Sequence, residues 1–195
     1  MESPLWFRFL LLSLAAANGA LLHSGEETEA IESLVHFTRS HHMAADESVL
    51  GMVGFYGQPL PPQWLILTTI EGEPDILKES VFARNEVIAE RRFRRLPGQD
   101  LPTIPISLKK VSIDSDKAFA IVEAKAKVEE VAFESLHYQL RCRTAGHEPV
   151  WLLSLLNRSQ SVVGLLYVSA SSGEILEEKW PRRNTWKIEP ERTGS

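Results

Sequence analysis

The feature that most constrains the fold of this chain is an internal similarity at a spacing of 87 residues. When residues 26–95 are shifted by 87 positions, they align with residues 113–182 without a gap and match at twelve positions. One match lies in a Pro-x-Trp-Leu sequence, where Trp64 aligns with Trp151. Because tryptophan is a rare residue, this match carries more weight than the others. Similarity at a fixed period indicates that one structural unit is used twice.

Each half begins with a predicted helix. Residues 24–27 have the S-x-x-E spacing of a capping box, and apolar residues then recur at helical spacing to about Met43. In the second half, Asp114 or Ser115 can cap a helix that continues to about Glu130. We expect the apolar stripe of each helix to pack on a sheet.

Strand patterns follow each predicted helix. The expected ranges are 49–56, 63–70, 77–84 and 87–94 in the first half, and 136–143, 150–156, 162–170 and 174–180 in the second. Asn85-Glu86 and Ser172-Gly173 occupy the positions where tight turns should join the last two strands of each half. The pattern predicts an α+β fold, in which a helix packed on a small antiparallel sheet occurs twice in tandem.

The expected organisation has five parts. These are a signal peptide at 1–20, a first repeat at 21–95, a Pro-rich linker at 96–107, a second repeat at 108–180 and a polar tail at 181–195.

The N-terminus has the pattern of a signal peptide. Arg8 precedes the apolar run 9–17, and small residues continue to Ala20. The run is short for a membrane span, which needs about 20 residues, so cleavage is favoured over retention as an anchor. We therefore expect a periplasmic or secreted protein with no stable membrane span after signal removal.

The second half resembles a PepSY domain. The resemblance rests on the helix sequence 115–122, on Pro149-Val150-Trp151-Leu152, and above all on residues 166–176, an extended stretch with a Ser-Gly turn followed by Glu and an aliphatic residue. Ser169 stands where the family usually has Asp, and Ser172 where it has Thr. The resemblance covers residues 110–180 and is weaker over 26–95. It implies a non-catalytic module that binds a peptidase or another envelope partner.

Five residues are candidates for a ligand or partner surface: Tyr56, Trp64, Arg91, Arg92 and Trp151. Tyr56 adjoins a Pro-rich loop that could border a groove. The two arginines belong to a basic cluster that either protects an edge strand or meets an anionic partner. Each tryptophan opens an apolar strand, which favours a core position over ligand stacking.

Residues with catalytic or metal-binding chemistry form no recognisable motif. His36, His41 and His42 lack the i, i+4 spacing of zinc ligands on one helix. Strand alternation places His137 and the single cysteine, Cys142, on opposite faces, because their separation is odd. We expect no catalytic residue, no metal site and no cofactor.

Glu90 and Glu177 occupy equivalent positions in the two halves, but nothing in the sequence places their carboxyl groups within the spacing that glycoside hydrolysis requires. The favoured interpretation is a polar residue on the open side of each last strand.

These observations predict an exported, non-enzymatic protein that binds a protein or peptide. The net charge of -5 disfavours nucleic acid. Two alternatives remain: a small-ligand carrier or hydrolase with a pocket between helix and sheet, and a purely structural envelope component.

Overall fold

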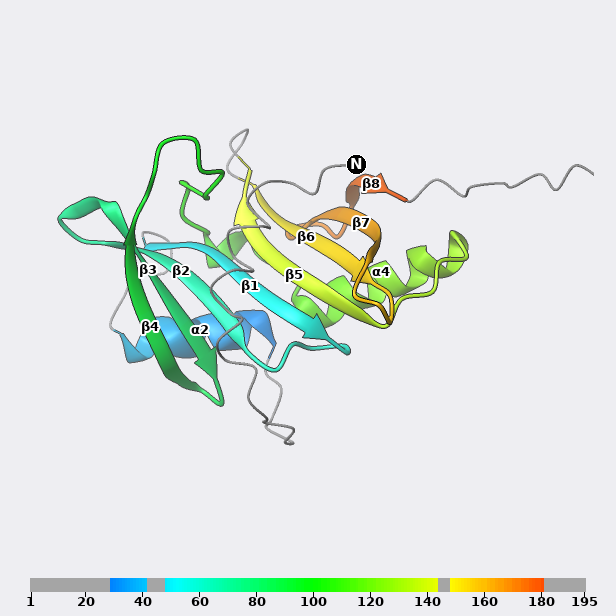
Figure 1. The fold of residues 1–195 in the computed structure, drawn as a ribbon, viewed down its shortest axis with the longest axis horizontal. Helices are drawn as coiled ribbons and strands as arrows, with labels where there is room; N and C mark the ends of the chain where they lie inside the picture. The colour runs from blue at the N-terminus through cyan, green and yellow to red at the C-terminus, as the bar shows by residue number, and fades with distance from the viewer. Residues whose placement is uncertain (1–28, 42–47, 144–147, 181–195) are drawn as a thin grey trace, which may run out of the picture.

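In the computed structural model of the chain, eight strands form one antiparallel sheet (Figure 1). The structure describes residues 29–41, 48–143 and 148–180. The strands are β1 (Val49–Gly57), β2 (Trp64–Ile70), β3 (Glu73–Ala83), β4 (Glu86–Arg94), β5 (Ser135–Cys142), β6 (Pro149–Leu156), β7 (Val162–Ser169) and β8 (Ile175–Lys179). The helices are α2 (Ala30–Ser40), the short 3-10 helix η1 (Leu108–Lys110) and α4 (Ser115–Val128).

The strand order corrects the predicted fold class. Across the sheet it is β4-β3-β2-β1-β5-β6-β7-β8, so the first four strands and the last four meet where β1 pairs with β5. In that pairing Gly51 lies opposite Arg141, and Met52 lies opposite Leu140. The predicted tandem repeat of a helix on its own small sheet is therefore wrong. Two separate sheets would leave β1 and β5 as edges, whereas here their backbone groups hydrogen-bond to each other.

Several individual elements lie where the sequence pattern places them. Seven of the eight strands begin and end within one residue of the predicted positions, while β3 begins four residues before position 77, at Glu73. The helix α4 begins at Ser115 with Asp114 as its N-cap, as predicted. The predicted signal peptide, the capping box at residues 24–27 and the polar tail lie outside the described residues.

Both helices pack on one face of the sheet, called here the helix face (Figure 1). At its centre Tyr138 lies between Trp64 and Trp151, with ring centroids 5.9 Å and 6.1 Å away in edge-on geometry. The Trp151 indole Nε1 donates a hydrogen bond to the Ile113 carbonyl at 2.8 Å. Both tryptophans are buried, which confirms the prediction that they anchor the core.

The opposite side of the sheet, called here the second face, has a different composition. Strand alternation places on it the residues opposite the helix face, among them Leu65, His137, Gln139 and Leu152. A smaller apolar cluster on the β2–β3 side contains Leu50, Leu67 and Leu77. The second face therefore mixes apolar and polar side chains, whereas the helix face carries the main core.

The predicted linker, residues 96–107, is packed against the sheet. Leu101 contacts the smaller apolar cluster of the second face. The Asp100 carboxylate lies 3.5 Å from the Arg141 guanidinium on β5. The backbone N–H of Ile106 donates to the Val49 carbonyl at 2.7 Å. The segment thus connects β4 with α4, and contacts with β1 and β5 fix its position.

One carboxylate serves the first turns of both helices. Asp114 Oδ1 accepts hydrogen bonds from the Ser115 N–H at 2.6 Å and from the Ile31 N–H at 3.1 Å. The hydroxyl of Ser115 accepts from the Ala30 N–H at 3.0 Å. The first N–H groups of a helix have no partner within the helix, and a negative charge there is favourable. Asp114 therefore ties the start of α2 to the start of α4.

We predict that Asp114→Ala lowers the free energy of unfolding by about 2 kcal/mol, because it removes a cap from two helices at once. Urea denaturation followed by circular dichroism measures this change. Asp116→Ala is the matched control, since Asp116 is an exposed first-turn carboxylate of α4. Equal losses in the two variants would contradict a shared cap.

Candidate functional site

A β-bulge in β1 creates the most distinctive local geometry among the described residues. The register between β1 and β5 shifts between Gly54 and Gly57. Two residues of β1, Phe55 and Tyr56, therefore share the place opposite one residue of β5, His137. Bulges re-aim side chains and are common next to functional sites. This one directs two aromatic rings to the same histidine.

The three side chains form a compact group, called here the bulge cluster. The rings of Phe55 and Tyr56 stand edge-on to the His137 imidazole, with centroids 5.0 Å and 4.6 Å away. Phe55 and His137 are buried, whereas Tyr56 is 41% exposed. Tyr56 has a φ of 58°, in the left-handed region that a bulky residue rarely adopts. The cluster thus presents one strained, exposed aromatic side chain above a buried histidine.

Two glycines let the Pro-rich loop between β1 and β2 pack against the bulge. A Cβ at Gly54 would lie 2.5 Å from Pro61 Cγ, and one at Gly57 would lie 2.7 Å from Tyr138 Cε2. Neither contact is sterically possible without a shift of neighbouring atoms. The Tyr138 hydroxyl also donates a hydrogen bond to the Pro59 carbonyl. The loop is therefore held closely on both sides of the bulge.

Burial determines the charge of the histidine in the bulge cluster. Removal from water disfavours the imidazolium and lowers the pKa of His137 to about 4. The imidazole is therefore neutral near pH 7, when one ring nitrogen can donate and the other can accept a hydrogen bond. On the same face, Gln139 is buried, and its Oε1 makes no hydrogen bond to the described residues.

The second face also carries a well-defined ion pair near the β4 edge. The Arg91 Nε lies 2.6 Å from Glu79 Oε1, and an Arg91 terminal nitrogen lies 2.9 Å from Glu79 Oε2. Glu79 is buried, while the Arg91 side chain is 45% exposed. The Arg91 guanidinium also stacks over Phe93 at 5.4 Å from the ring centroid. Arg91 and Phe93 therefore share one face of β4, as residues two apart on a strand do.

The five residues predicted as a binding surface do not come together. Trp64 and Trp151 are buried on the helix face. Tyr56 and Arg91 lie on the second face, separated by β2 and β3. Arg92 points to the other side of β4, with its guanidinium 3.5 Å from the Glu73 carboxylate.

Of the predicted residues, the bulge cluster contains only Tyr56. Sequence reasoning missed Phe55 and His137, because alternation along one strand does not show which strand lies beside it.

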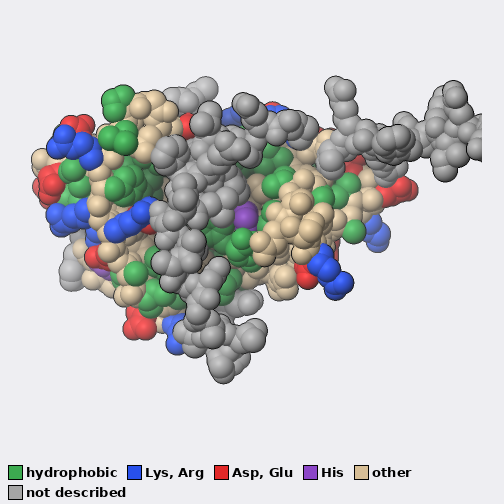
Figure 2. Space-filling model, in the orientation of Figure 1, with side chains coloured by type: hydrophobic (Ala, Val, Ile, Leu, Met, Phe, Trp, Pro, Cys, Tyr) green, Lys and Arg blue, Asp and Glu red, His purple; other side chains and the backbone are tan. Residues whose placement is uncertain are grey.

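Figure 2 views the second face. Where described side chains are visible, hydrophobic groups gather over the sheet, and charged groups of both signs lie toward the outer strands.

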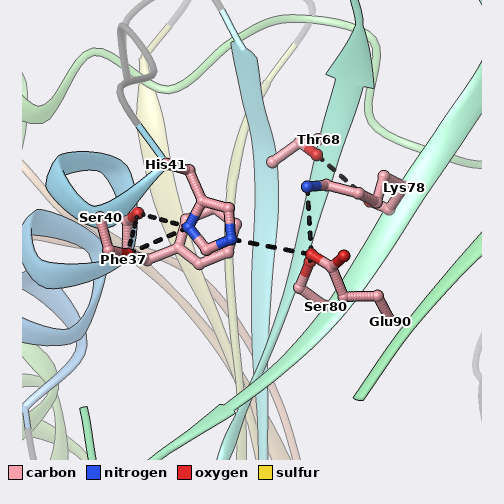
Figure 3. Close-up of polar contacts among 7 residues, drawn as sticks. All are labelled: Phe37, Ser40, His41, Thr68, Lys78, Ser80 and Glu90. Atoms are coloured by element: carbon pink, nitrogen blue, oxygen red, sulfur yellow. Dashed lines mark hydrogen bonds and ion pairs between the residues drawn. The ribbon is translucent and has the colours of Figure 1, made fainter. Parts of the chain in front are cut away.

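A polar cluster on the helix face, at the C-terminal end of α2, is the other candidate (Figure 3). Glu90 Oε1 lies 3.1 Å from Lys78 Nζ, 2.9 Å from Ser80 Oγ and 3.9 Å from His41 Nε2. Partial burial favours the protonated acid, but the hydrogen bonds from Lys78 and Ser80 outweigh it, so the pKa of Glu90 is lowered. The cluster joins α2 to β3 and β4.

This cluster does not have the geometry of a nucleophilic site. The buried Ser80 hydroxyl donates to Glu90, so the carboxylate stands between the serine and His41. A serine nucleophile needs a base at its own hydroxyl, oriented in turn by a third group. The arrangement therefore serves to connect elements through hydrogen bonds and charge.

Two further candidates from the sequence are separated or enclosed. Glu90 and Glu177 lie on β4 and β8, the opposite edges of the sheet, seven strand spacings or roughly 34 Å apart, so they form no acid–base pair. Cys142 is buried on the helix face, and its Sγ donates to the Pro105 carbonyl at 3.3 Å. Burial raises the pKa of the Cys142 thiol, which disfavours the reactive thiolate.

The described residues contain neither a metal-binding cluster nor a membrane-spanning helix. Within 29–41, 48–143 and 148–180, no three His, Cys, Asp or Glu side chains gather closely enough to hold a metal ion. In the part of the chain that the structure describes, neither helix is long and apolar enough to span a bilayer.

Comparison with known proteins gives a likeness of fold alone. No family model matches the chain, and no curated protein matches its sequence. Its fold is similar to the crystal structure of a putative lipoprotein from Clostridium difficile 630, with a TM-score of 0.52 and 9% sequence identity. The similarity covers 84% of this chain and 100% of the other. The PepSY resemblance of the second half remains a prediction.

We predict that the buried imidazole makes stability depend on pH. The pKa of His137 in the folded state, about 4, lies below the value near 6.5 of an unfolded chain. The unfolded chain therefore binds more protons below about pH 6.5, and stability falls as the pH is lowered from there toward 4. The contribution lost by pH 5 is about 2 kcal/mol.

Urea denaturation at several pH values between 7 and 5 measures this effect. His137→Gln should flatten the profile, whereas His36→Gln, which removes a half-buried imidazole of α2, should retain it. An unchanged slope in His137→Gln would contradict the assignment.

We also predict unequal roles for two neighbouring arginines. Arg91→Ala should lower the free energy of unfolding by about 2 kcal/mol, because it leaves the buried Glu79 carboxylate without its bidentate partner. Arg92→Ala should cost less than about 0.5 kcal/mol, because its ion pair is exposed. Thermal or urea unfolding of both variants tests this order, and equal values would refute it.

Proposed function

We propose that this is an exported, non-catalytic protein that binds a protein or peptide partner through the bulge cluster on its second face. One observation carries the proposal: Tyr56 is exposed and is held at a φ of 58°. A left-handed conformation costs an ordinary residue about 1–2 kcal/mol, and glycine would adopt it without that cost. A large aromatic side chain kept in a strained and exposed position is best explained by a contact that it makes with another molecule.

The chemistry around Tyr56 supports recognition. Tyrosine and arginine are the residue types that most often dominate binding energy at interfaces. Tyr56 has a rigid neighbour on each side, because Phe55 and His137 are buried and the Pro-rich loop is packed against the bulge. A side chain whose surroundings are already ordered loses little conformational entropy when a partner binds.

The same surroundings support binding without catalysis. A general base has to accept a proton near the working pH. His137 is neutral at pH 7, but its pKa of about 4 makes it a weak base. Two aromatic rings enclose it, and the bulge cluster contains no serine, threonine or cysteine for it to activate.

Export is supported by the N-terminal sequence, in which a basic residue, an apolar run and small residues occur in order. The structural neighbour, named a lipoprotein, is a second supporting observation for a role at the cell envelope. We propose a periplasmic or secreted location for the mature protein.

Site-specific photo-crosslinking tests the proposed surface. A photoreactive phenylalanine analogue at position 56 should capture one partner from an envelope extract of the source organism, and an excess of the unlabelled protein should abolish that capture. The matched control carries the analogue at Val128, which is 74% exposed on α4. Capture of the same proteins from both positions, or from neither, would refute a partner site at the bulge cluster.

We predict that Tyr56→Gly separates stability from binding. Glycine relieves the left-handed strain at residue 56 and loses the ring contacts with His137 and Phe55, so the free energy of unfolding should change by less than about 1 kcal/mol. Affinity for the captured partner should fall at least about tenfold, because an aromatic anchor is removed. A variant that keeps full affinity would contradict the role of Tyr56.

A further inference from the structure

The strand β4 ends the sheet on one side, and two exposed arginines lie at alternate positions near its C-terminal end. It has nine residues and pairs with β3 from Ala83↔Glu86 to Ile76↔Arg94, with one irregularity near the hairpin turn. On an edge strand, alternate backbone N–H and C=O groups point away from the sheet. Among the described strands, none lies beyond β4. It therefore offers a long, regular edge for another extended segment.

The helix-face side of β4 carries Glu90, Arg92 and Arg94 in one line, and Glu90 is already bound by Lys78 at 3.1 Å. Arg92 and Arg94 are two residues apart and share that side, and Lys78 of β3 is the direct pairing partner of Arg92. Both arginines are exposed. Among the residues that the structure describes, the acidic partner of this arginine pair is Glu73, 3.5 Å from Arg92, in an ion pair whose side chains are 65% and 46% exposed. Such a pair is weak and can be exchanged for another.

We propose that β4 accepts an extended segment of a partner as a ninth strand, and that this segment has acidic side chains at alternate positions. The inference rests on the proposed partner-binding function and names the chemistry of the segment bound. Backbone hydrogen bonds to an edge strand supply affinity, and alternate side chains supply specificity. Acidic residues two apart on the added strand would lie directly opposite Arg92 and Arg94, where opposite charges attract across a sheet.

The other edge of the sheet does not offer the same features. The strand β8 has five residues, too few for a long ladder. Its carboxylates already have cationic partners: Glu177 lies 2.9 Å from Lys179 Nζ, and Glu178 lies 3.0 Å from Lys125 Nζ. The choice of β4 thus follows from its length and from the two exposed arginines at alternate positions on it.

The test measures the binding of a short labelled peptide to the full chain by fluorescence anisotropy. In this peptide Glu alternates with Thr and Val. A scrambled peptide of the same composition should bind at least about tenfold more weakly, because its carboxylates no longer share one side of the strand. Affinity for the alternating peptide should decrease in high salt.

A charge-reversal experiment identifies the site. Arg92→Glu/Arg94→Glu should lose at least about tenfold in affinity for the Glu peptide, and should bind the corresponding Lys peptide better than the unmodified protein does. Arg158→Glu is the matched control, because Arg158 is 94% exposed in the turn between β6 and β7. It should change affinity by less than about twofold. Circular dichroism confirms that each variant is folded.

Equal binding of the alternating and scrambled peptides would overturn the proposal, as would full affinity of the charge-reversed variant. Tyr56→Gly should leave peptide binding at β4 unchanged, since residue 56 lies on β1 and the second face. A failure at β4 is therefore distinguishable from a failure of the partner site at the bulge cluster, which is tested by crosslinking at position 56.

Discussion

The pairing of β1 with β5 is the interaction on which the rest of the structure depends. It joins the first four strands to the last four, and it places residues from distant parts of the chain in the centre of both faces. Without it, each of these strands would have an unpaired edge in the middle of the molecule. With it, the backbone groups of both strands are satisfied, and only β4 and β8 remain as edges of the described sheet.

This central pair also separates the core from the proposed binding site. On the helix face it contributes Met52 and Tyr138 to the main core, between the two buried tryptophans. On the second face the same two strands carry the bulge cluster, where an extra residue in β1 brings Phe55 and Tyr56 to His137. The core can thus be closely packed while the other face retains strain, a buried imidazole and an exposed aromatic side chain. Asp114 supports this division by holding the first turns of both helices together on the core side.

Sequence reasoning was strongest for local structure. Alternating and apolar runs predicted strand bounds close to the observed ones. The short polar sequence before residue 115 predicted the start of α4 and its Asp114 cap. It also identified Tyr56, through the proline-rich loop beside it. It did not identify Phe55 and His137 as neighbours, because a β-bulge and a strand pairing leave little trace in the local pattern. Strand alternation already divides the arginines of β4 between two faces, but their different partners, Glu79 for Arg91 and Glu73 for Arg92, became clear only from the structure.

The sequence by itself determined which segments are helix and strand and which aromatic residues anchor the core, because hydrophobic periodicity and residue size act locally along the chain. Only the tertiary structure decided that the strands form one sheet. Hydrogen bonding between strand edges depends on backbone groups that every residue carries, so no side-chain pattern specifies that β1 meets β5. The same holds for the site: the strain at Tyr56 and the lowered pKa of His137 arise from what surrounds them in space.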